Sequence, residues 1–123
     1  MSVAELKRAH ALRHAAGIVG WAHGVLGLSF EEIGAAVGAD ERTVRRWRSA
    51  EVAPRGRHQA RLDELVELRH LLGEVFPGAR EAAEWLETPV RAFRGHAPIA
   101  MLRRGRLASV VEALATMESG AYL

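Results

Sequence analysis

The 123-residue sequence contains no cysteine and no apolar run close to the roughly 20 residues that a membrane-spanning helix needs. Without cysteine, disulfides and thiolate metal sites are excluded, and a reducing compartment is tolerated. The N-terminal segment is amphipathic and carries Glu5, so it lacks the pattern of a signal peptide. We therefore expect a cytoplasmic protein that does not contact a membrane.

Motifs of common enzyme classes are also missing. The sequence has no glycine-rich phosphate loop, no nucleophile elbow and no carboxylate pair that differs from ordinary surface acids. His10 and His14 have the spacing of two metal ligands on one helix face, but no glutamate follows His10 and no third ligand is evident. This pattern favours a solvated histidine pair. We expect no catalytic activity, no cofactor and no metal.

Lysine is nearly absent, and the arginines that replace it are unevenly placed. Lys7 is the only lysine, whereas the sequence contains sixteen arginines, and the net charge of the chain is only +2. Seven of these arginines lie within residues 40–61. The same stretch contains three acidic residues, so its local net charge is +4. A basic patch confined to one region is typical of proteins that bind nucleic acid.

Residues 28–47 have the pattern of a helix-turn-helix, two short helices that cross at a tight turn. Apolar or small residues occupy the positions that such a pair buries: Ile33, Gly34, Val37, Ala39, Val44 and Trp47. Gly38 lies at the turn, where a residue without a Cβ takes the left-handed conformation at no steric cost. An ordinary amphipathic helix pair with a solvated charged face is the alternative, which the combination of turn, caps and spacing disfavours.

Capping residues predict the bounds of both helices. Ser29 and Glu32 have the spacing of a capping box, in which each side chain bonds a free backbone N–H, so the first helix should cover residues 30–37. Asp40 is a good N-cap for a second helix over about residues 41–49. The second helix should therefore start at a fixed angle to the first.

The outer face of this second helix is the candidate DNA-binding surface, because a guanidinium can bond both acceptors of guanine. Val44 and Trp47, three residues apart, would hold the opposite face against the domain. The candidates for contacts in the groove are Arg42, Thr43, Arg45 and Arg46. The candidates for phosphate contacts are Arg48, Arg55, Arg57 and Arg61. One such helix reads few bases, so we expect a homodimer with recognition helices about 34 Å apart.

The rest of the chain predicts helices and no strands, so the expected fold class is all-α. The first 27 residues should be helical after the Ser2 cap, with a possible break near Gly17. An apolar stripe there should pack on the helix-turn-helix: Ile18, Trp21, Ala22, Val25 and Leu26. A long helix over residues 58–75 has a wide apolar surface, which indicates packing on two sides, either between two subdomains or across a dimer.

Shorter helices are expected after Pro77-Gly78. They should cover residues 79–87, a segment capped by Thr88 with Pro89 in its first turn, residues 97–102 and residues 106–118, with a stop at Gly120. Trp85 and Phe93 should fill the core. The expected domains are a DNA-binding region (1–57), a connecting helix (58–76) and a small helical C-terminal domain (77–123).

The second half also carries a series of short motifs. In order they are Glu84-Trp85-Leu86, Pro89, Phe93, Gly95, Ala97-Pro98, Met101-Leu102, Gly105, Val111-Glu112-Ala113-Leu114 and Glu118-Ser119-Gly120. This series resembles the toxin-binding domain of the Xre/MbcA/ParS antitoxin family, in which an Xre-type helix-turn-helix precedes that domain. The resemblance covers nearly the whole chain from Ile18 onward.

This resemblance implies an antitoxin encoded beside a toxin, commonly one with a RES domain that consumes NAD. The antitoxin would bind the toxin, block its substrate pocket and repress its own operon by binding promoter DNA. A stand-alone helix-turn-helix regulator with a helical dimerisation domain, and an inhibitor that no longer binds DNA, are the alternatives.

The family's use of its C-terminal region directs attention to the end of the chain. Tyr122 and Leu123 supply an aromatic and an apolar anchor just past the helix stop, and a frayed terminus is the alternative. Arg103 and Arg104, beside Arg106, could pair with acids around a toxin pocket, although a solvated turn is favoured. The candidate toxin-binding residues are Arg103, Arg104, Gly120, Ala121, Tyr122 and Leu123.

Overall fold

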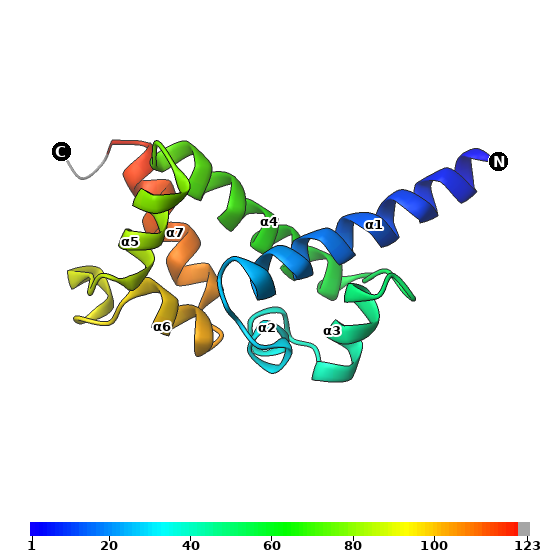
Figure 1. Cartoon of the computed structure of the whole chain (residues 1–123), viewed down its shortest axis with the longest axis horizontal. Coiled ribbons are helices and arrows are strands. Elements are labelled where there is room, and N and C mark those ends of the chain that lie inside the picture. Colours follow the sequence, from blue (N-terminus) through cyan, green and yellow to red (C-terminus); the bar gives the residue numbers. More distant parts are fainter. Residues whose placement is uncertain (121–123) are drawn as a thin grey trace. The chain divides into compact units, whose positions relative to one another are not determined.

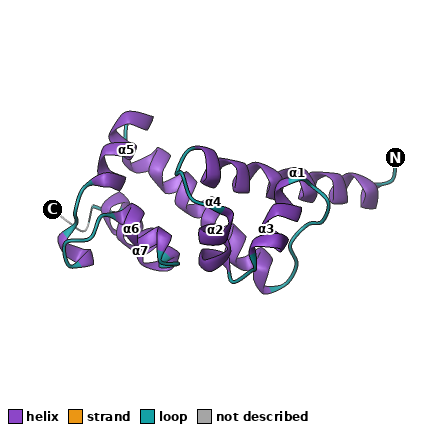
Figure 2. Cartoon of the chain, turned by 60° about the horizontal axis from the view of Figure 1, so that its bottom comes forward, coloured by secondary structure: helices purple, strands orange, loops and turns teal. Residues whose placement is uncertain are grey.

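The computed structural model describes residues 1–120, and this part of the chain contains helices and no strands (Figures 1 and 2). The helices are α1 (Val3–Gly24), α2 (Phe30–Val37), α3 (Glu41–Arg48), α4 (Arg57–Val75), α5 (Ala79–Glu87), the short 3-10 helix η1 (Arg91–Phe93), α6 (Pro98–Arg103) and α7 (Leu107–Glu118). The all-α prediction is confirmed. The chain forms two compact units, Met1–Leu62 and Asp63–Leu123. The three expected domains, with residues 58–76 as a connection, stay a prediction.

α1 is one continuous helix of 22 residues. The hydroxyl of Ser2 accepts a hydrogen bond from the backbone N–H of Glu5 at 3.1 Å, as an N-cap does. The possible break at Gly17 does not occur, because Gly17 lies within the helix. The predicted stripe is wrong at Val25: the helix ends at Gly24, and Val25 is 70% exposed.

In the first unit α1 packs on α2 and α3, which pack on each other (Figure 1). Each helix contributes apolar side chains at helical spacing to one core, and burying them supplies most of the stabilisation of such a unit. The buried residues from these three helices include Ile18, Val19, Ala22, Ile33, Val37, Val44 and Trp47. Val44 and Trp47 therefore anchor the inner face of α3 in this core, as the sequence predicts.

α4 starts at Arg57, one residue before the predicted start, and buries a row of leucines: Leu62, Leu65, Leu68, Leu71 and Leu72. In the second unit α6 packs on α5 and α7. The buried side chains from α5 to α7 include Leu86, Phe93, Pro98, Ile99, Leu102, Leu107, Val110, Ala113 and Leu114. None of the helices in residues 1–120 combines the length and hydropathy that a bilayer crossing requires.

Two predictions for the second unit are wrong. Thr88 does not cap a helix that begins at Pro89; its backbone is extended at φ −96° and ψ 129°, and the next helical turn is η1. Thr88 is instead the C-cap residue of α5, and its hydroxyl donates a hydrogen bond to the carbonyl of Glu84 in the last turn of that helix. Trp85 is half-buried and packs against Phe76, with ring centroids 5.6 Å apart, whereas Phe93 is buried as predicted.

Candidate nucleic-acid interface and C-terminal surface

The start of α2 is fixed by the predicted capping box. The Ser29 hydroxyl accepts a hydrogen bond from the N–H of Glu32 at 3.0 Å, and the Glu32 carboxylate accepts one from the N–H of Ser29 at 2.9 Å. Two backbone donors that a helix start leaves free are therefore satisfied.

The turn between α2 and α3 depends on two glycines. Gly38 adopts the left-handed conformation at φ 76°, and its N–H bonds the carbonyl of Gly34 at 2.8 Å. Gly34 is buried, and a Cβ placed on it would collide with the carbonyl oxygen of Ala39. The sequence pattern identifies Gly34 as a small buried residue, but the close approach of the turn backbone explains why it must be the smallest.

Asp40 caps α3 with a hydrogen bond of 2.7 Å from the N–H of Thr43 to its carboxylate. This hydrogen bond is the main reason why the pKa of Asp40 is lower than its usual value. The charges of Arg42 and His58 also lower this pKa, but by less. His58, from the first turn of α4, lies 3.1 Å from the carbonyl of Gly38 and packs edge-on against Trp47 at 5.5 Å. The sequence analysis did not identify His58 as a support for this turn.

α3 carries the predicted arginines on its exposed face. Arg42, Arg45, Arg46 and Arg48 are exposed, and Thr43 is half-buried. Arg45 bonds Glu41 at 2.8 Å and lies over the ring of Phe30. A Cβ on Gly20 would lie 3.1 Å from the guanidinium of Arg48, so Arg48 rests on α1.

The predicted phosphate contacts that follow α3 are also at the surface. Arg55 is exposed in the loop before α4, and Arg57 and Arg61 are exposed in the first turns of α4. The first unit thus presents arginines from α3 and from the segment after it. This distribution of charge, on a helix-turn-helix, is suited to a polyanion such as DNA.

The candidate toxin-binding residues of the second unit lie at two places. Arg103 and Arg104 are exposed at the end of α6, where Gly105 turns the chain at φ 76°. Gly120 is half-buried and has φ 77° after the end of α7. The other candidates, Ala121, Tyr122 and Leu123, lie outside the described residues.

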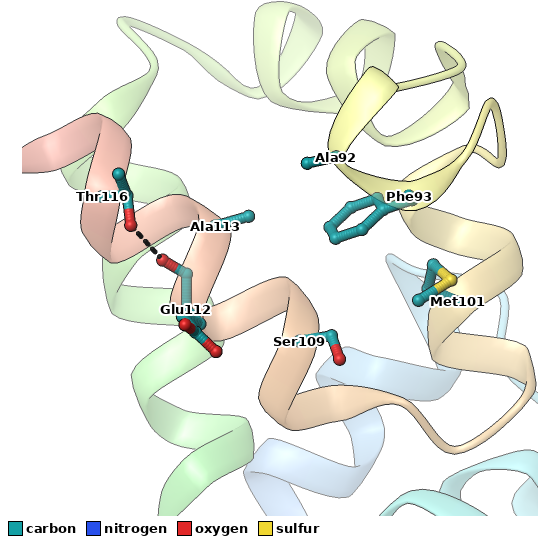
Figure 3. Close-up of a pocket in the computed structure, with 7 residues that line it drawn as sticks. All are labelled: Ala92, Phe93, Met101, Ser109, Glu112, Ala113 and Thr116. Atoms are coloured by element: carbon teal, nitrogen blue, oxygen red, sulfur yellow. Dashed lines mark hydrogen bonds between the residues drawn. The ribbon is translucent and has the colours of Figure 1, made fainter. Parts of the chain in front are cut away.

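A hollow of about 300 Å³ lies between η1, α6 and α7 (Figure 3). Its lining residues are Ala92, Phe93, Met101, Ser109, Glu112, Ala113 and Thr116. Phe93 and Met101 come from the η1 and α6 side, and the polar residues come from α7, where the Thr116 hydroxyl donates to the carbonyl of Glu112 at 2.9 Å. The volume is at the lower end for small-molecule sites. The sequence analysis did not predict this feature.

Among the described residues, no third side chain is placed to complete a metal site with the histidine pair of α1. The rings of His10 and His14 stack with centroids 6.0 Å apart. Within residues 1–120, no group of three or more histidine or acidic side chains is arranged to hold a metal ion.

The chain is thus an all-α protein with a helix-turn-helix followed by a second helical unit. Comparison with known proteins identifies the family to which it belongs. Residues 71–120 match the family model for the antitoxin Xre/MbcA/ParS C-terminal toxin-binding domain. The mycobacterial cidal antitoxins MbcA of Mycobacterium tuberculosis and Mycobacterium bovis are each 33% identical to this chain over 98 residues, which is 80% of this chain and 86% of the relative.

A solved structure agrees with these matches. The chain is similar to one in the crystal structure of the M. tuberculosis MbcT–MbcA toxin–antitoxin complex, with a TM-score of 0.55 and 31% identity, covering 88% of this chain and 96% of the other. The protein therefore belongs to the Xre/MbcA/ParS antitoxin family.

Proposed function

We propose that this chain is the antitoxin of a type II toxin–antitoxin system. It binds and inhibits a RES-domain toxin that consumes NAD and is encoded by the adjacent gene, and it represses its own operon by binding promoter DNA as a homodimer. It acts in the cytoplasm and has no catalytic activity of its own. The observation that carries the proposal is the match of residues 71–120 to a toxin-binding domain, in a chain similar to one solved in a complex with its toxin.

Co-expression with the neighbouring reading frame tests the inhibitory role. We expect a stable complex that protects the host from NAD loss and growth arrest. A neighbour that is harmless alone, or that does not bind this chain, would favour the stand-alone regulator. The chain belongs to an antitoxin family, and its relatives align over most of their length. This membership supports the antitoxin role over that of a stand-alone regulator.

Deleting residues 121–123 tests how the toxin is blocked. An aromatic and an apolar side chain just past a helix stop can anchor a short plug in a pocket, so the deletion should release toxin activity. DNA binding should persist, because the candidate DNA-binding residues all lie before residue 62. Full inhibition by the shortened chain would rule out the hypothesis that residues 121–123 block the toxin pocket. Arg103 and Arg104 would then remain as candidate contacts.

The reciprocal variant tests the DNA-binding role. Replacing Arg45 and Arg46 with alanine removes two exposed cations from α3, so binding to the DNA upstream of the operon should be lost while toxin inhibition remains. Wild-type affinity should fall about a thousandfold between 50 and 200 mM salt, as expected for several phosphate contacts. An unchanged gel shift for the double variant would refute the assignment of α3 to the groove.

A further inference from the structure

Arg45 differs from the other arginines of α3 because two neighbouring side chains hold its guanidinium. Its Nε and Nη2 donate to the same carboxylate oxygen, Oε1 of Glu41, at 3.2 and 2.8 Å. Its Cζ lies 4.6 Å from the ring centroid of Phe30, the first residue of α2. The Arg45 side chain is nevertheless 59% exposed. A long side chain on the outer face of α3 therefore has one defined orientation.

The ring that supports this guanidinium is itself held in place. The imidazole of His23, in the last turn of α1, stacks on Phe30 with centroids 4.2 Å apart and planes inclined by 15°. His23 Nδ1 lies 2.8 Å from the carbonyl of Leu28. The Phe30 ring therefore contacts both His23 and Arg45. Side chains from α1, α2 and α3 together orient Arg45.

The bonds to Glu41 leave one edge of the guanidinium available. The carboxylate takes the side edge, formed by Nε and Nη2. The end edge, formed by Nη1 and the second N–H of Nη2, makes no bond within the described residues. That edge has two parallel N–H donors, which match the O6 and N7 acceptors of guanine in the major groove.

The carboxylate also favours a base over a phosphate as the partner of this edge. Glu41 is an exposed anion next to Arg45, so a phosphate brought to the pair meets repulsion as well as attraction. A guanine edge carries no net charge and meets only the oriented donors. Arg42 and Arg46 have no comparable clamp in the part of the chain that the structure describes.

We propose that Arg45 specifies a guanine in the bound DNA and that Glu41 and Phe30 are positioning residues that orient it. The inference rests on the proposed DNA binding. An oriented guanidinium has less rotational freedom to lose when it binds, so the clamp raises the discrimination between bases.

Selection of bound sequences from a randomised double-stranded DNA library tests the proposal. The wild-type chain should prefer guanine at one position of each half-site by about 5- to 150-fold. Arg45→Lys keeps the charge but loses the planar fork, so this preference should weaken severalfold while the dependence of affinity on salt changes little. Arg46→Lys is the matched control on the same helix, and it should retain the preference.

Two variants of the positioning residues give different signatures. Glu41→Gln removes the clamp and a negative charge, so the guanine preference should fall about twofold while affinity for unselected DNA rises. Phe30→Leu removes the platform without a change of charge, so the preference should fall about two- to fivefold and affinity for unselected DNA should not rise. A purely structural role for Glu41 would lower both quantities together.

The outcomes separate this inference from the proposed function. If the wild-type chain binds no DNA, both fail. If it selects a sequence and Arg45→Lys selects the same one with the same preference, only the inference about Arg45 is overturned. A guanine preference that disappears in Arg46→Lys and remains in Arg45→Lys would assign the reading role to the neighbouring arginine and would also overturn it.

Discussion

The two units of this protein start their helices in different ways. In the first unit α1, α2 and α3 each begin with an N-cap residue whose side chain accepts a hydrogen bond from a backbone N–H. These residues are Ser2, Ser29 and Asp40. In the second unit α5, η1, α6 and α7 begin without a side-chain cap. The geometry of the first unit is thus specified by local hydrogen bonds at exposed positions, in addition to its core.

The second unit relies on burial and on backbone restriction instead. Pro98 occupies the first turn of α6, where its missing N–H costs nothing. Helices of 6 to 12 residues are marginal in water, so α6 and α7 depend on the leucines that they bury. The difference suits the proposed roles, because a recognition helix needs a fixed angle and a protein-binding surface needs a continuous core beneath it.

Substitution of a buried glycine in the first unit should have the largest effect on stability. Gly34→Ala places a Cβ against the carbonyl oxygen of Ala39, a backbone atom that cannot move without opening the turn. We expect a loss of about 3 kcal/mol in the free energy of unfolding, together with loss of DNA binding. Urea denaturation measures the first quantity, and a gel shift measures the second.

Gly78→Ala is the matched change in the second unit. A Cβ there would lie 3.1 Å from Oε2 of Glu81, the end of a flexible side chain that can rotate away. Its cost should stay below about 1 kcal/mol, the ordinary difference between glycine and alanine at a helix start. Equal losses from the two variants would contradict the view that the turn of the first unit is the tighter structure.

A smaller change tests the caps themselves. Ser29→Ala removes the hydroxyl that accepts from Glu32, so the first unit should lose about 1 kcal/mol. In the second unit Thr88→Ala removes a hydroxyl that bonds the carbonyl of Glu84 at the end of α5, and the change should stay within about 0.5 kcal/mol. Thermal unfolding of both variants measures the contrast, and a larger loss from Thr88→Ala would reverse it.

The same contrast explains which parts of the fold follow from the sequence. Caps are local signals, so the start and end of α2 and the start of α3 agree with the predicted residues. At Thr88 and Pro89 the local pattern predicts a helix start, but the Thr88 hydroxyl bonds the last turn of the preceding helix α5 instead. The exposure of Trp85 depends on the packing around it, which no local pattern describes.

The candidate DNA interface was predictable to a similar degree. The exposed arginines of α3 follow from helical periodicity, and their roles stay predictions. The clamp on Arg45 has one local signal, the four-residue spacing of Glu41 and Arg45. The contribution of Phe30 has none, because it arises only after α2 and α3 have packed. His58 likewise reaches the turn from twenty residues away along the chain.

The cap of α3 should give the first unit a dependence on pH, the smallest of these effects. Its hydrogen bond from Thr43 lowers the pKa of Asp40 in the folded chain below the ordinary value of 3.8. A lowered pKa means that the carboxylate stabilises the fold at every pH above about 3.8, and that this contribution is lost as the pH falls through the lower, folded-state pKa.

Asp40→Asn is the matched variant, because asparagine caps a helix without titrating. The wild-type chain should unfold at a higher temperature than this variant near neutral pH, and the difference should shrink as the pH falls below that of an ordinary aspartate. Thermal unfolding of both proteins across this range measures the difference. A constant difference at every pH would show that the charge of Asp40 adds nothing to the cap, and that the hydrogen-bond geometry alone holds the start of α3.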